Sequence, residues 1–156
     1  MSRPDAGRGD MPASPTHVVT CFLLRRDRGA DEVLLARRSE RVRTYKGAWA
    51  AISGYIESGV SPIEQAYLEL VEETGFQRAD VTLLREGEPL AFRDESIAQG
   101  WVVHPFLFLA LRPDAAQRDW EAQEFAWTRP AALRTLPTVP QLADALARVY
   151  PPTAEA

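Results

Sequence analysis

Three glutamates, Glu69, Glu72 and Glu73, have the residue type and the spacing to hold a metal ion. At positions i, i+3 and i+4 of a helix they share an arc of about 100°. They lie near the C-terminal end of the predicted helix, where the helix dipole disfavours negative charge. A solvated acidic face is one interpretation. The other is a site for a hard divalent cation, because Mg²⁺ binds carboxylates together with the phosphates of a substrate.

The helix that carries these glutamates is predicted over Ser61–Thr74. Ser61-Pro62-Ile63-Glu64 is a capping box with proline at the first helical position, and Gly75 is suited to a left-handed C-cap. One face is apolar and should pack on a sheet; it consists of Ile63, Ala66, Tyr67, Leu70 and Thr74. The three glutamates are expected on the far side of the helix.

The segment from Gly54 to Phe76 resembles the Nudix box, a motif of 23 positions with fixed spacing. The first glycine of the box falls on Gly54, its last three glutamates on Glu69, Glu72 and Glu73, and its final glycine on Gly75. The similarity to the family extends over roughly residues 17–149.

Two positions depart from the box. The family's first glutamate and its arginine, which commonly form an ion pair between loop and helix, fall on Val60 and Leu68. Replacement of an ion pair by an apolar contact is often neutral or stabilising. We therefore expect Val60 and Leu68 to form an apolar clasp that excludes water, and the alternative is a box that has lost its function.

The resemblance implies a metal-dependent hydrolase that cleaves the diphosphate linkage of a nucleoside diphosphate derivative: a nucleoside diphosphate sugar, ADP-ribose or a nucleoside triphosphate. It assigns Mg²⁺ or Mn²⁺ to Glu69, Glu72 and Glu73, with the backbone carbonyl of Ser53 as a further ligand. A non-catalytic Nudix-fold module that senses a nucleotide is the alternative.

The general base is left open by the resemblance. It is Glu69 or Glu72 of the box, or a glutamate from a distant loop, for which Glu121 ranks above Glu124. Residues 25–46 are rich in arginine and suit a polyphosphate, since arginine binds phosphate oxygens through two parallel hydrogen bonds. Arg37 and Lys46 are the predicted substrate-binding residues of this segment.

The composition limits the class of protein. The 156 residues are 46% hydrophobic and 26% charged, with a net charge of −4, which is typical of a single globular domain and argues against a nucleic-acid binder. One cysteine excludes an intrachain disulfide. No apolar run has the length of a membrane span, and the N-terminus lacks the apolar stretch of a secretory signal, so we expect a cytoplasmic protein without a membrane partner. The oligomeric state stays open, with a homodimer as the assembly to test.

The remaining pattern predicts an α/β fold. Strands are expected at 17–24, 33–36, 49–52, 81–84, 89–92, 101–111 and 125–128, and a second helix at 139–149. The resemblance implies a Nudix-type α/β/α sandwich with a mixed β-sheet, one catalytic helix and a C-terminal helix. We expect a single domain at 17–150 between flexible tails at 1–16 and 151–156.

Overall fold

The computed structural model of the chain describes residues 14–152. Their strands are β1 (Thr16–Asp27), β2 (Ala30–Arg38), β3 (Trp49–Ala50), β4 (Ile52–Tyr55), β5 (Val81–Glu86), β6 (Leu90–Asp94), β7 (Gln99–Ala110) and β8 (Ala122–Thr128). The helices are α2 (Pro62–Thr74) and α3 (Leu142–Ala147), with 3₁₀ turns η1 (Arg78–Asp80), η2 (Pro113–Ala115) and η3 (Pro130–Thr135).

All these strands belong to one mixed sheet built on β1 and β7. These two strands run parallel, in register from Thr16 opposite Trp101 to Leu24 opposite Leu109. The other edge of β1 pairs antiparallel with β4 along its first half and with β2 along its second half. Because β1 lies between β4 and β7, it brings residues from three distant parts of the chain to one place.

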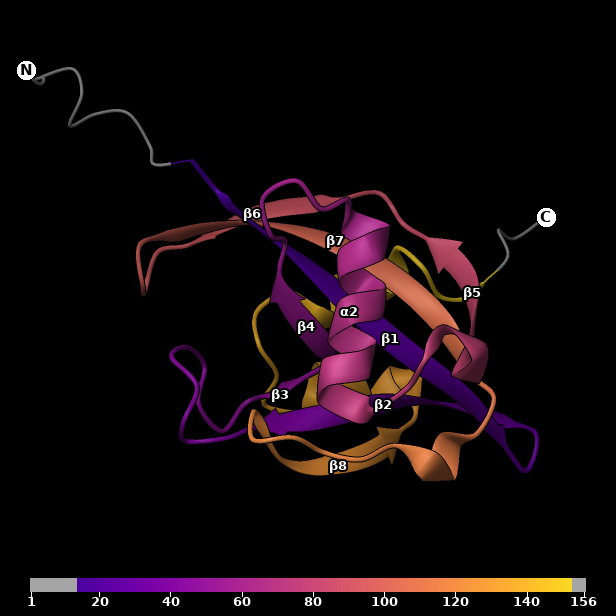
Figure 1. Cartoon of the computed structure of the whole chain (residues 1–156). Helices are drawn as coiled ribbons and strands as arrows, with labels where there is room; N and C mark the ends of the chain where they lie inside the picture. The colour runs from indigo at the N-terminus through magenta and orange to yellow at the C-terminus, as the bar shows by residue number, and fades with distance from the viewer. Residues whose placement is uncertain (1–13, 153–156) are drawn as a thin grey trace, which may run out of the picture.

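The sheet is covered on both faces, as a three-layer fold requires. In Figure 1, α2 lies in front of the sheet and the gold C-terminal segments lie behind it. Alternate side chains of β1 divide between the two layers: Cys21 and Leu23 pack on the α2 side, whereas Phe22 and Leu24 pack with α3. The predicted α/β sandwich is confirmed.

Local signals place the ends of α2. The Ser61 side chain accepts a hydrogen bond from the Glu64 backbone N–H at 3.3 Å, and Gly75 ends the helix with φ of 80°. The second half of the expected capping box is not used, because Glu64 accepts two hydrogen bonds from Arg78 Nη2, each of 2.9 Å.

Three expected elements differ from the structure. The segment 49–52 divides at Ala51 into β3 and β4. The helix expected over 139–149 is only Leu142–Ala147, since Pro140 precedes it and Gln141 is left-handed with φ of 65°. Of the predicted tails, residues 1–13 and 153–156 lie outside the described residues, and Thr16 already belongs to β1. No helix in the described part of the chain is long and apolar enough to span a membrane.

Candidate active site

Glu69 and Glu73 are buried beneath α2, each with only 8% of its surface exposed. The prediction that all three glutamates lie on the far side of the helix is therefore wrong for these two, and only Glu72 is exposed. For Glu69 the reason is Gly54 in β4: a Cβ atom at this position would overlap the Glu69 carboxylate. The glycine thus leaves room for a carboxylate between the helix and the sheet.

Burial disfavours the ionised form of both carboxylates of this pair. Burial raises the pKa of Glu73 well above its usual value, and contact with Glu69 and the charge of Glu121 raise it further. Burial is also the main cause that raises the pKa of Glu69. One oxygen, Glu73 Oε2, is buried without a hydrogen-bond partner. A divalent cation fits these residues, because it supplies the positive charge and the partner that this oxygen lacks.

The side chains of the described residues do not form a complete metal cage. Within residues 14–152, no three His, Cys, Asp or Glu side chains gather as a ready-made site. Mg²⁺ commonly uses only one or two carboxylates, with waters and substrate phosphates as its other ligands. The donor set that fits such a cation is the Glu69–Glu73 pair, with exposed Glu72 one turn or less away on the same helix.

Glu121 lies directly before β8 and is fixed by its backbone. Its carbonyl accepts a hydrogen bond from the Ser39 N–H at 2.9 Å, and its own N–H donates to Asp119 Oδ1 at 3.0 Å. Burial, followed by the charges of Asp119 and Glu69, raises the pKa of Glu121 to about 7. A carboxyl group with this pKa is suited to proton transfer near neutral pH.

A pocket of about 160 Å³ opens on the side of β4 that faces away from α2. Its walls are largely apolar and aromatic, and Ser53, Gly54 and Glu121 lie on its border. The rings of Tyr55 and Trp101 are nearly parallel, with centroids 6.4 Å apart. Trp101 is only 8% exposed, whereas Tyr55 is 55% exposed, and an exposed aromatic ring can stack on a nucleobase. The pocket and the buried glutamate pair thus lie on opposite sides of Gly54.

The loop before β3 is tied to the rim of this pocket. The Tyr45 hydroxyl donates to Asp94 Oδ2 at 2.7 Å and accepts from Trp101 Nε1 at 3.2 Å. These two bonds hold the indole ring of Trp101 in one orientation. Lys46, the next residue, is exposed and does not line the pocket.

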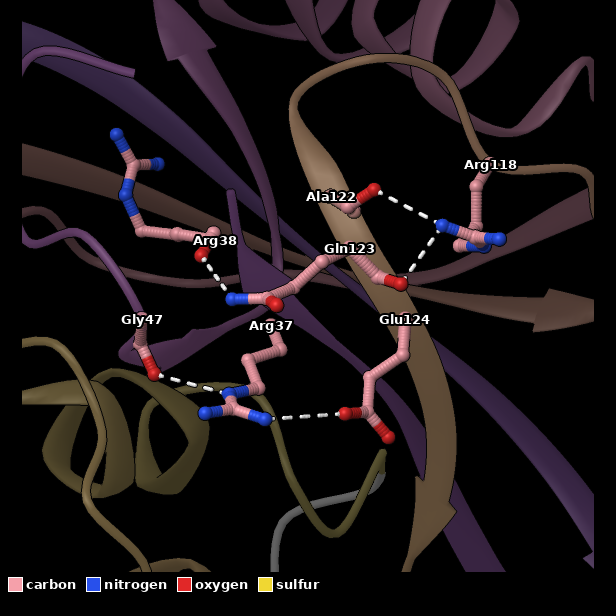
Figure 2. Close-up of polar contacts among 7 residues, drawn as sticks. All are labelled: Arg37, Arg38, Gly47, Arg118, Ala122, Gln123 and Glu124. Carbon is pink, nitrogen blue, oxygen red and sulfur yellow. Dashed lines mark hydrogen bonds and ion pairs between the residues drawn. The ribbon is translucent and has the colours of Figure 1, made fainter. Parts of the chain in front are cut away.

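Arg37 and Arg38 lie differently although they are neighbours. Arg37 Nη1 contacts Glu124 at 3.3 Å, and its Nε donates to the Gly47 carbonyl at 3.4 Å. Figure 2 shows the Arg38 guanidinium pointing away from this pair. Arg38 lines the pocket together with Glu121. The pairing of β2 with β8 shifts register between the two arginines, which changes how their side chains project.

Arg38 is a residue that the sequence-based prediction missed. Its Nε donates to the Thr44 carbonyl at 2.9 Å, which fixes the guanidinium at the pocket.

Gln65, which contacts Glu69 inside the protein, was missed as well. The signal that could have identified Gln65 is its spacing, because residues i and i+4 of a helix are neighbours.

The expected clasp between Val60 and Leu68 is not formed as a water-excluding contact. Leu68 is 49% exposed and belongs to neither core cluster. Half of the Leu68 side chain stays in solvent. Val60 and Leu68 therefore do not replace the family's ion pair with a buried apolar contact.

The fold and the motif together define the class of protein. The NUDIX domain family profile matches residues 15–150. The chain therefore belongs to the NUDIX domain family, and its fold and family support the predicted enzyme class, a Nudix-type pyrophosphohydrolase.

Solved structures share the fold of this chain. An Ap4A hydrolase of C. elegans is 19% identical, with a TM-score of 0.72 over 85% of this chain and 93% of that chain. The NUDIX domain of Shewanella oneidensis NrtR, complexed with ADP ribose, is 16% identical, with a TM-score of 0.69 over 88% of this chain and 87% of that one. At these identities the likeness concerns the fold alone.

A curated relative is longer than this chain. The octanoyltransferase of Myxococcus xanthus is 33% identical over 142 residues, which cover 85% of this chain and 36% of that protein. This chain therefore matches only about a third of the length of that relative.

Proposed function

We propose that this protein is a metal-dependent pyrophosphohydrolase that cleaves the phosphoric anhydride bond of a nucleoside diphosphate derivative in the cytoplasm. The observation that carries the proposal is the position of Gly54 between the buried Glu69–Glu73 pair and the aromatic pocket. Glu121 connects the two regions, because it borders the pocket and its pKa is raised by burial and by the charge of Glu69.

The proposed cation is Mg²⁺ or Mn²⁺, held by Glu69, Glu72 and Glu73 with the backbone carbonyl of Ser53. When bound, it would screen the charge of the diphosphate and lower the pKa of water. The orphaned Glu73 Oε2 supports this assignment, because a buried carboxylate oxygen without a partner is costly.

Glu121 is our proposed general base. It borders the pocket, and burial and the charges of Glu69 and Glu72 raise its pKa. Glu121 therefore lies close to both the pocket and the glutamates of α2. Glu69 or Glu72 is the alternative base. Glu124 is less suited, since its carboxylate already contacts Arg37.

Arg37 and Lys46 remain our proposed substrate-binding residues, and we add Arg38. The position of Arg38 in the pocket wall supports this addition. A guanidinium group binds two phosphate oxygens at once, which a lysine ammonium cannot do in the same geometry.

The proposal is tested with a substrate panel in the presence of Mg²⁺ or Mn²⁺, with products separated by chromatography. The panel contains ADP-ribose, Ap4A, nucleoside diphosphate sugars and nucleoside triphosphates. We expect cation-dependent cleavage of at least one compound, lost in Glu73→Gln. The matched control is Glu64→Gln on the same helix, whose carboxylate binds Arg78 instead.

A nucleotide-sensing module without catalysis is the second candidate function. The absence of the family's ion pair at Val60 and Leu68 favours it. Such a module would bind a panel compound in calorimetry and release no product with either cation.

A further inference from the structure

The loop before α2 is joined to the helix through one buried side chain, Gln65. Only 1% of Gln65 is exposed, although glutamine is usually a surface residue. Its Oε1 accepts a hydrogen bond from the Glu57 backbone N–H at 3.0 Å, and its Nε2 donates to Glu69 Oε2 at 2.8 Å. A single amide group thus connects the loop backbone to a carboxylate of the candidate metal site.

An amide is well suited to this position. It is a donor and an acceptor at once, so it satisfies a buried N–H and a buried carboxylate oxygen with one side chain. A leucine here would leave both groups without a partner. A glutamate could still accept from Glu57 but, when ionised, could not donate to Glu69 and would repel it.

The connection lies where this chain lacks the family's usual one. Val60 and Leu68 occupy the positions of the loop-to-helix ion pair, and Leu68 is half exposed. The Gln65 bridge joins the same two segments by a different route, from Glu57 in the loop to the second turn of α2.

We propose that Gln65 is the positioning residue of the metal site: it holds the loop on α2 and fixes the Glu69 carboxylate for cation binding. The inference rests on the proposed function, because it assumes that Glu69 binds a divalent cation. A partner of this kind that orients a metal ligand typically affects metal affinity by 10–100-fold.

The experiment measures Mn²⁺ binding by the full chain without substrate, from the electron paramagnetic resonance signal of free Mn²⁺. The variants are Gln65→Glu, which keeps the acceptor for Glu57, and Gln65→Leu, which removes both hydrogen bonds. The control is Gln117→Leu, at an exposed glutamine outside the site. Amide hydrogen exchange at Glu57 reports the loop contact, and circular dichroism reports the fold.

We expect both Gln65 variants to weaken Mn²⁺ binding at least about tenfold, with the control unchanged. Glu57 should exchange faster only in Gln65→Leu. If Gln65→Leu does not fold, Gln65→Glu alone tests the contact with Glu69. Wild-type affinity in a folded Gln65→Glu would overturn the inference.

Failure of the proposed function can be recognised separately. A wild-type protein that binds Mn²⁺ but hydrolyses no panel compound would contradict the hydrolase proposal, and weakened Mn²⁺ binding in the Gln65 variants would still support the inference. A wild-type protein that binds no Mn²⁺ would overturn both.

Discussion

Glu69 and Glu73 lie one helical turn apart with their carboxylates against the sheet, and each is 8% exposed. Burial raises the pKa of both groups, and contact with Glu69 raises that of Glu73 further. Two adjacent buried carboxylates destabilise the metal-free protein, since ionised groups are poorly solvated there and repel each other. A cation bound by the two carboxylates would remove this destabilisation, because its positive charge offsets their repulsion.

Glu73→Gln should abolish most turnover and stabilise the metal-free protein. The substitution removes a proposed cation ligand, so turnover should fall by more than the 10–100-fold typical of outer-shell changes. Without metal, a gain of about 1 kcal/mol would raise the melting temperature by about 2–4 °C. Calorimetry in EDTA at pH 8 measures the gain. A lower melting temperature with full turnover would contradict the metal-site assignment.

Glu72→Gln should also reduce turnover but leave the metal-free stability nearly unchanged. Glu72 is exposed, so its removal relieves little desolvation. Steady-state kinetics and calorimetry on the same sample check the two effects. If the Glu72 and Glu73 variants were stabilised equally, burial of Glu73 would not be the cause of the stabilisation.

Stability of the metal-free protein should fall as pH rises from about 5 to about 8. The pKa of Glu121 is raised to about 7, whereas that of a glutamate in an unfolded chain is about 4.3. Between these values the folded state retains a proton that the unfolded state has released, so the free energy of unfolding decreases with pH.

Thermal melts in EDTA across this range test the pH dependence. Glu121→Gln should flatten the decrease, and the part that remains would come from Glu69 and Glu73, whose pKa values are also raised. Added Mn²⁺ should restore stability at pH 8 by mass action. An identical pH profile in wild type and Glu121→Gln would be inconsistent with the raised pKa.

Glu121→Gln should reduce turnover at least about a hundredfold, the low end for loss of a general base. Glu124→Gln is the matched control, because its carboxylate contacts Arg37 at the surface and exposed ion pairs contribute only about 0.2–1 kcal/mol. Steady-state kinetics distinguish them. A loss confined to the Glu124 variant would move the base to that residue.

Arg38→Lys should raise KM about tenfold or more, because hydrogen bonds to charged groups contribute about 1.5–3 kcal/mol. Lysine keeps the positive charge but cannot form the two parallel hydrogen bonds of a guanidinium group. Arg37→Lys should have a smaller effect, since Arg37 is engaged with Glu124 and Gly47 (Figure 2). A larger KM increase for Arg37→Lys would support the original sequence-based choice.

Leu68→Arg should change the free energy of unfolding by less than about 0.5 kcal/mol. The side chain is 49% exposed, so the arginine can extend into solvent. Urea denaturation measures the change. A loss of about 1–3 kcal/mol would instead indicate the buried clasp with Val60 that the sequence suggested.

Much of the fold was predictable because the signals are local. Ser61 and Gly75 mark the ends of α2 through backbone hydrogen bonds and a left-handed φ, both of which depend on neighbours within a few residues. The apolar residues of β7 identify a central strand by their density alone. The box glycines and glutamates identify the family through fixed spacing, again along one continuous segment.

The interior of the site depends on contacts between distant segments. Periodicity placed Glu69 and Glu73 on the solvent side, because the pattern counts carboxylates as polar. It does not register that Gly54, on strand β4, leaves space for the Glu69 carboxylate. Nor does it show that Arg37 pairs with Glu124, 87 residues away, while Arg38 lines the pocket.

The sequence by itself determined the family, the sheet-and-helix composition and the set of glutamates, since each follows from residue type and short-range spacing. Only the tertiary structure decided which glutamates are buried, which arginine reaches the pocket and that Gln65 joins the loop to Glu69. The physical reason is that burial and hydrogen-bond partners arise when strands pair and a helix packs on them, and these long-range contacts determine the pKa values and the geometry of the site.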